Sequence, residues 1–126
     1  MPETIVRHLI PKTHYIAYES VMTSHEKIYI GDRTIDGLVV TVNGQPLDQR
    51  LDIETFSVNG FEWSYAGDES RQLALALLAD HLADEQQALA LSEAFMQDVV
   101  SELENTWELS SADIEAALQE IRARQT

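Results

Sequence analysis

The stretch that decides the fold runs over residues 61–79 and reads FEWSYAGDESRQLALALLA. Its last seven residues are all Leu or Ala, so they leave no polar face on a helix. A helix that is apolar all round is buried all round, and LALALLA therefore predicts a central core helix over 69–82. The polar DESRQ forms its first turn. We expect Asp68 or Ser70 to be the cap, with Asp68 and Glu69 at the positive end of the helix dipole.

Two further helices are predicted downstream. Asp84 and Gln87 stand at the spacing of a capping box, and apolar residues then recur at helical intervals at Ala88, Leu91, Phe95, Val99 and Leu103. Ser110 and Asp113 repeat that spacing ahead of a third helix, whose apolar face comprises Ile114, Ala117, Leu118 and Ile121 and whose end carries Arg122 and Arg124. We expect Trp107 to pack between these last two helices.

The N-terminal half is typical of strands and turns. TIVRHLI and HYIAYESVM favour short strands or an arm, while KIYIG and GLVVTV are rich in β-formers and predict an antiparallel pair. Asn43 and Gly44 predict a tight turn, after which Pro46 restricts the chain to a sheet edge or an extended connection. In FEWSY, the aromatic residues Phe61, Trp63 and Tyr65 share one face at the period of a strand.

This order of elements predicts an α+β fold, with a small N-terminal antiparallel sheet packed against three C-terminal helices. The sequence shows no internal repeat, low-complexity tract or long linker. We therefore expect residues 1–126 to form a single domain, with an N-terminal arm or strands over 1–27, a strand-rich part over 28–66 and three helices over 68–124.

Charge is the strongest global signal. The 126 residues include 22 Asp and Glu against 8 Lys and Arg, a formal net charge of −14. Such a surface repels phosphates and anionic lipids, so we expect no direct binding to nucleic acid and no membrane binding. The acidity fits either adaptation to a high-salt cytoplasm or a mimic of DNA. We favour adaptation because the acids are spread along the whole chain and Lys is scarcer than Arg.

The setting that the sequence favours is the cytoplasm. There is no Cys, which excludes a disulfide framework and a thiolate nucleophile. The opening MPETIVRHLIPK has a Pro and scattered charges where a signal peptide has an apolar core, and the longest strongly apolar run, over 73–79, is too short to span a membrane. We therefore expect a soluble, cytoplasmic protein.

The segment over residues 60–103, GFEWSYAGDESRQLALALLADHLADEQQALALSEAFMQDVVSEL, resembles the signature of an uncharacterised family, the domain of unknown function DUF6166. Its members carry the phrase Phe-x-Trp-Gly-Tyr-x-Gly-Ser-Gly-Pro-x-Gln-Leu-Ala-Leu-Ala. The resemblance reaches upstream through YIGDRTIDGLVVTVNGQPLDQRL and covers about residues 28–121 in all. It implies the domain and its fold, and it implies no reaction.

The chain departs from the family phrase at the entrance to the first helix. The family's Gly-Ser-Gly-Pro turn would place a glycine-rich loop at a helix N-terminus, where backbone N–H groups can hold an anion. Here the matching residues are Gly67, Asp68, Glu69 and Ser70, so two carboxylates occupy that position. We expect no anion site here and favour the interpretation that the family's glycines form a tight turn.

Candidate site residues gather at the same junction. The aromatic side chains of Phe61, Trp63 and Tyr65 favour core packing, and the alternative is a ligand groove in which Gly67, Arg71 and Gln72 also take part. Gln72 is a polar residue next to an apolar run and is shared with the family phrase, so we expect it to bond the preceding turn.

The sequence predicts no catalytic residue, no metal and no cofactor. His8, His14 and His25 lie on different predicted elements, and the set of Asp80, His81 and Asp84 favours a polar helix end over a metal site. There is no Gly-x-Ser-x-Gly, P-loop or dinucleotide fingerprint.

We therefore expect a non-enzymatic, acidic protein-binding or regulatory module from a halophilic host. Its partner is expected to be a protein, and a homo-oligomer stays open. One alternative is a small-ligand binder or enzyme that uses the Trp63–Gln72 junction, and another is an acidic DNA mimic. A protein-binding module is expected to expose an apolar patch, which we place on the second or third helix.

Overall fold

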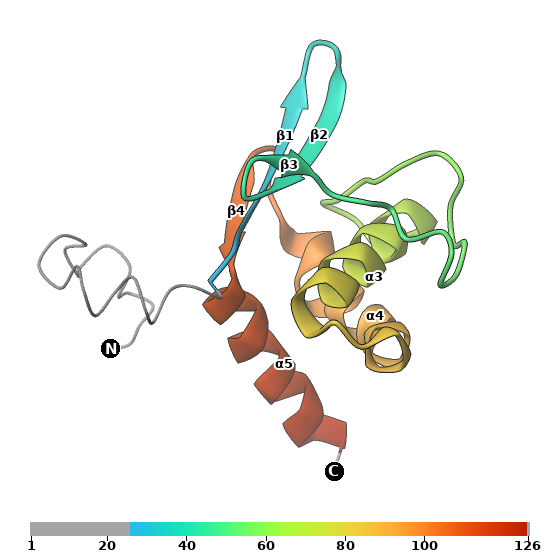
Figure 1. Ribbon diagram of the computed structural model, residues 1–126, viewed down its shortest axis with the longest axis vertical. Helices are drawn as coiled ribbons and strands as arrows, with labels where there is room; N and C mark the ends of the chain where they lie inside the picture. Colours follow the sequence, from blue (N-terminus) through green and yellow to red (C-terminus); the bar gives the residue numbers. More distant parts are fainter. Residues whose placement is uncertain (1–25, 126) are drawn as a thin grey trace, which may run out of the picture.

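The computed structural model describes residues 26–125 as a four-stranded antiparallel sheet packed against helices (Figure 1). The elements follow in the order β1 (Ile28–Thr34), β2 (Gly37–Val42), β3 (Gln45–Pro46), α3 (Asp68–Leu82), α4 (Glu85–Asp98), the 3-10 helix η1 (Val100–Glu102), β4 (Trp107–Ser110) and α5 (Ser111–Gln125). The predicted α+β class is confirmed. The strands expected in TIVRHLI and HYIAYESVM lie outside the described residues.

The sheet has the order β3-β2-β1-β4, and the predicted antiparallel pair of β1 and β2 forms its centre. Tyr29 pairs with Val42 and Gly31 with Val40, and this face of the pair points toward the core. The turn into β3 is also as expected, because Asn43 and Gly44 both have positive φ, of 50° and 85°. Pro46 ends the short edge strand β3, where its missing N–H breaks no ladder.

The fourth strand was not predicted, and it comes from the C-terminal half of the chain. β4 pairs with β1 in an antiparallel register that places Trp107 opposite Gly31. The indole of Trp107 lies across the Cα of Gly31, in space that any side chain there would need. The prediction that Trp107 packs between the last two helices is therefore wrong: a strand carries it onto the sheet, where its ring meets Trp63 edge-on at 5.6 Å.

Helix α3 is the core helix that LALALLA predicted. Every residue from Gln72 to Ala79 is buried, and the sheet, α4, α5 and the 47–67 segment surround it. Its start differs from the expectation. The helix begins at Asp68, and its N-cap is Gly67, with no side-chain capping bond; Asp68 is already helical and Ser70 is buried. The predicted Asp68 or Ser70 cap is therefore wrong.

The other two predicted caps are confirmed. The side chain of Asp84 accepts a hydrogen bond from the backbone N–H of Gln87 at 3.1 Å and opens α4. At the start of α5, Ser110 and Asp113 exchange two bonds, each side chain accepting from the other's backbone N–H. Helix α4 ends at Asp98, so Val99 and Leu103, which were expected on this helix, lie outside it. They flank the 3-10 helix η1 instead.

The segment FEWSY is not a strand, contrary to the prediction. Ser64 has a φ of 81°, which breaks the alternation of an extended chain. Its backbone N–H donates to the carbonyl of Val100 at 3.1 Å, so this segment bonds the helical layer instead of the sheet. Trp63 is consequently fully buried while Tyr65 is 45% exposed, and the three aromatic residues do not share one face.

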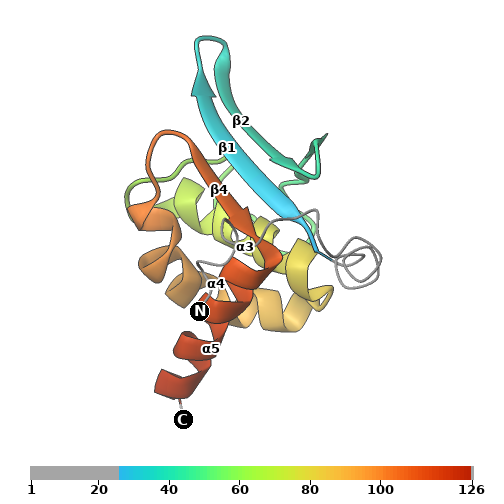
Figure 2. The same ribbon diagram turned by 90° about the vertical axis from the view of Figure 1, so that its left-hand side faces the viewer.

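The hairpin of β1 and β2 extends beyond the layer of helices, as both views show (Figure 1 and Figure 2). β4 pairs only with Ile28–Gly31, so the distal half of β1 pairs with β2 alone. In residues 26–125 there is no helix with the length and apolar character needed to cross a bilayer.

Substituting Gly31→Ala should destabilise the protein, because the new methyl group would overlap the Trp107 indole. We expect a loss of about 2 kcal/mol in the free energy of unfolding, measured by urea denaturation. In a double-mutant cycle with Trp107→Ala, the Gly31→Ala change should cost much less, since the overlap is gone. An equal cost in both backgrounds would contradict the packing described here.

Candidate functional site

The six residues that the sequence singled out surround the entrance to α3 and serve different purposes. They are Phe61, Trp63, Tyr65, Gly67, Arg71 and Gln72. Two of them, Trp63 and Gln72, are fully buried, and the others reach the surface to different extents. Their contacts decide whether the junction is a ligand groove or a packed support.

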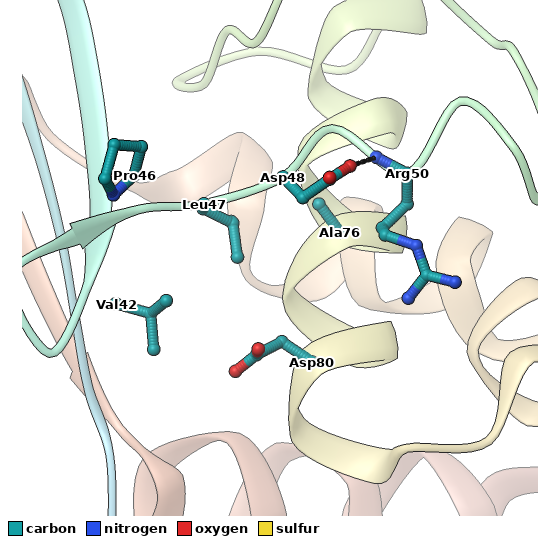
Figure 3. A pocket seen from close by; sticks show the side chains of 7 residues that line it. All are labelled: Val42, Pro46, Leu47, Asp48, Arg50, Ala76 and Asp80. Carbon is teal, nitrogen blue, oxygen red and sulfur yellow. Dashed lines mark hydrogen bonds between the residues drawn. The ribbon is translucent and has the colours of Figure 1, made fainter.

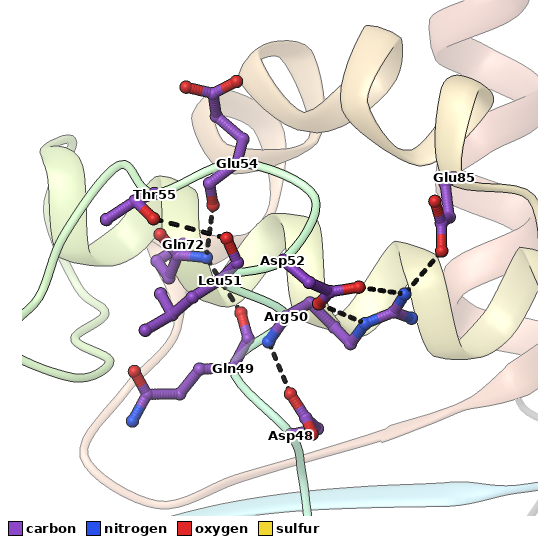
Figure 4. A network of polar contacts seen from close by, with 9 residues as sticks. All are labelled: Asp48, Gln49, Arg50, Leu51, Asp52, Glu54, Thr55, Gln72 and Glu85. Atoms are coloured by element: carbon purple, nitrogen blue, oxygen red, sulfur yellow. Dashed lines mark hydrogen bonds and ion pairs between the residues drawn. The ribbon is translucent and has the colours of Figure 1, made fainter.

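Gln72 holds the segment before α3 through four hydrogen bonds. Its amide oxygen accepts from the backbone N–H groups of Phe56 and Ser57 at 2.7 and 3.1 Å. Its amide nitrogen donates to the carbonyls of Gln49 and Glu54 at 2.8 and 3.1 Å (Figure 4). A glutamine side chain has two N–H donors and an oxygen that accepts two hydrogen bonds, and here all four are used. Gln72 therefore has no hydrogen-bonding capacity left for a ligand. We expected Gln72 to bond the preceding turn, but its partners lie farther upstream, in the segment over 49–57.

Trp63 is part of the core and not of a groove. Its ring meets Trp107 at an interplanar angle of 88°, and the guanidinium of Arg33 lies 4.8 Å from its centroid. Arg33 also donates to the carbonyl of Trp63 at 3.0 Å and pairs with Glu62 at 2.9 Å. The indole N–H groups of both Trp63 and Trp107 are buried without a hydrogen-bond acceptor. These contacts fasten the junction to the sheet.

Tyr65 and Gly67 make the turn into α3. The hydroxyl of Tyr65 donates to Glu69 at 2.8 Å, which raises the pKa of Tyr65 to about 12 and lowers that of the Glu69 carboxyl. The ring of Tyr65 lies so close to Gly67 that a Cβ there would come within 2.5 Å of it. A larger residue at position 67 would have to displace this half-exposed ring, whereas the backbone of Gly67 is extended, with a φ of −178°, and does not itself require glycine.

Arg71 links α3 to its neighbours. Its guanidinium lies 4.1 Å from the centroid of the Phe56 ring, its Nε donates to Ser92 at 3.1 Å and its Nη1 pairs with Glu93 at 3.3 Å. The charge of Arg71 is thus engaged within the chain. Phe61 is half-buried against the core.

A separate cavity of about 220 Å³ lies between β2, the segment after β3 and α3 (Figure 3). Its lining comprises Val42, Pro46, Leu47, Asp48, Arg50, Ala76 and Asp80, and none of the six predicted residues. No local pattern marks these residues in the sequence, because the fold brings together two separate stretches, residues 42–50 and two positions on α3.

The charged groups of this cavity already have partners. Asp80 accepts from the hydroxyl of Tyr29 at 2.7 Å and pairs with Lys27 at 3.0 Å, and burial together with Asp80 raises the pKa of Tyr29. Arg50 binds Asp52 through two bonds of 3.0 Å and Glu85 at 2.7 Å (Figure 4). Ligand binding would have to compete with these ion pairs, so the cavity is a weak candidate for a recognition site.

The match to a family model now identifies the family. The model of the family of unknown function DUF6166 matches residues 29–120, from β1 into the last turns of α5. The chain belongs to this family. The match includes the α3 junction, the cavity and the hairpin. Comparison with curated proteins and with solved structures gave no match.

The histidine residues do not form a metal centre within the described part of the chain. No group of three His, Asp or Glu side chains is placed there to hold a metal ion. His81 contacts Glu115 of α5 at 2.9 Å. His8, His14 and His25 lie outside the described residues.

The surface feature that sequence reasoning missed is apolar and lies on the hairpin. Ile30, Ile35, Leu38 and Val39, which we call the hairpin patch, are exposed, and Ile35 at the turn is 98% exposed. The other exposed large apolar residues of the described chain are Leu51, Val58 and Tyr65, so none lies on α4 or α5, where the patch was expected. The signal for it was an Ile in the turn of DRTIDG.

Replacing Gln72→Leu should destabilise the protein by about 3 kcal/mol, because two N–H groups and two carbonyls of the 49–57 segment lose their partner. Urea denaturation measures the change, and hydrogen exchange at Phe56 and Ser57 should accelerate. Gln97→Leu on the exposed side of α4 is the matched control and should change stability by less than about 0.5 kcal/mol. Similar costs for both variants would contradict the supporting role of Gln72.

Proposed function

We propose that the chain is a non-enzymatic protein-binding module and that the hairpin patch is its contact surface. The observation that carries the proposal is Ile35, a large apolar side chain left 98% exposed in a β-turn. Turns favour Gly, Asn, Asp and Ser at such positions, because these residues bond the turn and stay hydrated. An apolar side chain held out to solvent is instead suited to burial by a partner.

The rest of the patch supports this proposal. Val39 is 47% and Ile30 is 40% exposed on the outer face of the sheet, and Leu38 is 38% exposed on the opposite face, beyond the helices. Both faces of the hairpin therefore offer apolar area together with the turn. The hairpin itself projects beyond the helices (Figure 2). The residues of the α3 junction are engaged in contacts within the chain. This leaves the hairpin patch as the better candidate for a contact surface.

The setting we propose is a halophilic host. Every Lys and Arg within residues 26–125 is in an ion pair, and most Asp and Glu in that range are not. The unpaired carboxylates repel one another most at low ionic strength, where the Debye length is about 30 Å at 0.01 M against about 3 Å at 1 M. A high-salt cytoplasm would screen that repulsion.

The binding proposal is tested by removing apolar area from the hairpin patch. The variant Ile35→Asn with Val39→Thr keeps residues that suit a turn and a strand, so the fold should survive. We expect proteins captured from a host extract by the wild-type chain to bind this variant at least about tenfold more weakly. Val58→Thr, at a position 75% exposed outside the hairpin, is the control and should capture them normally. Equal capture by all three chains would contradict the proposal.

The halophilic setting is tested by following the fold across KCl, from low concentration to molar, with circular dichroism and light scattering. We expect the thermal midpoint to rise with KCl because screening relieves the repulsion of the unpaired carboxylates. A variant that carries Glu54→Gln, Glu102→Gln, Glu104→Gln and Glu120→Gln should depend less on salt. A fold that is indifferent to KCl would mean that the charge is not an adaptation to habitat.

A further inference from the structure

Three carboxylates border the hairpin patch, and none of them is in an ion pair within the described chain. Asp32 lies opposite Val39 in the β1–β2 ladder, and Glu108 of β4 lies opposite Ile30. Asp36 follows Ile35 in the turn. Directly paired residues share one face of a sheet, so Ile30, Asp32, Val39 and Glu108 lie together on the outer face. Apolar and acidic side chains are therefore interspersed over this surface.

No cation of the described chain is placed to neutralise these three groups. Arg33, the basic residue of the hairpin, points to the opposite face, where Glu62 and the carbonyl of Trp63 hold its guanidinium. The other Lys and Arg residues of that range have carboxylate partners elsewhere. Asp32 accepts one hydrogen bond, from the hydroxyl of Thr106 at 2.7 Å, and keeps its charge uncompensated.

We propose that the hairpin patch binds a basic protein partner, one that presents apolar side chains beside Lys or Arg. This step rests on the proposed function of the patch and names the chemistry of its occupant. Burying Ile35 and Val39 also removes water from the neighbouring carboxylates, which is unfavourable unless the partner supplies positive charge. A basic partner meets both requirements, and its charge also speeds the encounter with a chain of net charge −14.

A second copy of the chain is a poorer occupant of the same surface. Two copies joined through the hairpin patch would bring Asp32, Asp36 and Glu108 of one copy against acidic residues of the other. The like charges would oppose association just where apolar area favours it. A neutral apolar partner would leave the carboxylates without compensation.

The test uses two labelled peptides, one of alternating Val and Lys and one of alternating Val and Glu, with binding to the full chain measured by fluorescence anisotropy. We expect the Val–Lys peptide to bind and the Val–Glu peptide not to bind. The variant Asp36→Asn with Glu108→Gln should weaken Val–Lys binding by about fivefold. The matched control, Glu54→Gln with Glu120→Gln, removes the same charge from exposed positions outside the hairpin and should leave binding unchanged.

Each contrary result has a distinct meaning. An equal loss in the control variant, or no binding of the Val–Lys peptide, would overturn the basic-partner proposal, because the carboxylates that border the hairpin patch would then not select the partner. If Ile35→Asn with Val39→Thr abolished binding while both peptides bound the wild type equally, the binding module would stand and its basic partner would not. If neither the apolar nor the acidic variant altered binding, both proposals would fail. A dimer seen by sedimentation velocity and lost in the apolar variant would assign the surface to a second copy.

Discussion

Helix α3 has to be covered on every side, and the rest of the structure follows from that requirement. Its residues from Gln72 to Ala79 are all buried, so no direction around the helix can be left to solvent. One sheet cannot surround a helix, and one neighbouring helix cannot either. The chain therefore covers α3 with the sheet, with α4 and α5, and with the irregular segment over 47–67.

The irregular segment is the unusual part of this cover, because a loop that packs against a core brings polar backbone groups with it. Gln72 resolves this problem from within the helix. Its side chain supplies two acceptor and two donor interactions to the loop, and a Leu at the same place would supply none. The hydrogen bonds of Gln72 thus allow the irregular segment to cover α3 where a strand or helix would otherwise be needed. Arg50 adds an external tie through Asp52 and Glu85.

What the sequence predicted correctly depends on local chemistry. Asn43 and Gly44 make a turn because both tolerate positive φ, and the cap at Ser110 uses a partner only three residues away. One error is local, since Gly67 and not Asp68 or Ser70 is the N-cap of α3. The other errors concern contacts that join distant segments. The residues around Trp107 do not indicate that its indole packs on Gly31 of β1. Likewise, the segment FEWSY does not indicate that the backbone of Ser64 bonds Val100.

The same distinction holds for the candidate site. Aromatic residues beside a helix start are compatible with a groove or a packed wall, and only the position of Trp107 shows that Trp63 belongs to a wall. The cavity at Asp80 combines residues from separate segments, so no spacing in the sequence marks it. The hairpin patch did leave a local signal, the Ile in DRTIDG, but its exposure depends on where the helical layer ends.

The position of the hairpin beyond the helices raises the question of why its tip is apolar. Leu38 lies on the face of the sheet that is buried further along β2, at Val40, yet it is 38% exposed because the hairpin has passed the helices. Ile35 is still further out and contributes almost nothing to the core. A polar residue in that turn would preserve the hydrogen bonds that close it, between Thr34 and the backbone of Asp36 and Gly37. Stability of the isolated chain therefore does not explain the apolar tip, and this is the ground on which we propose that a partner covers it.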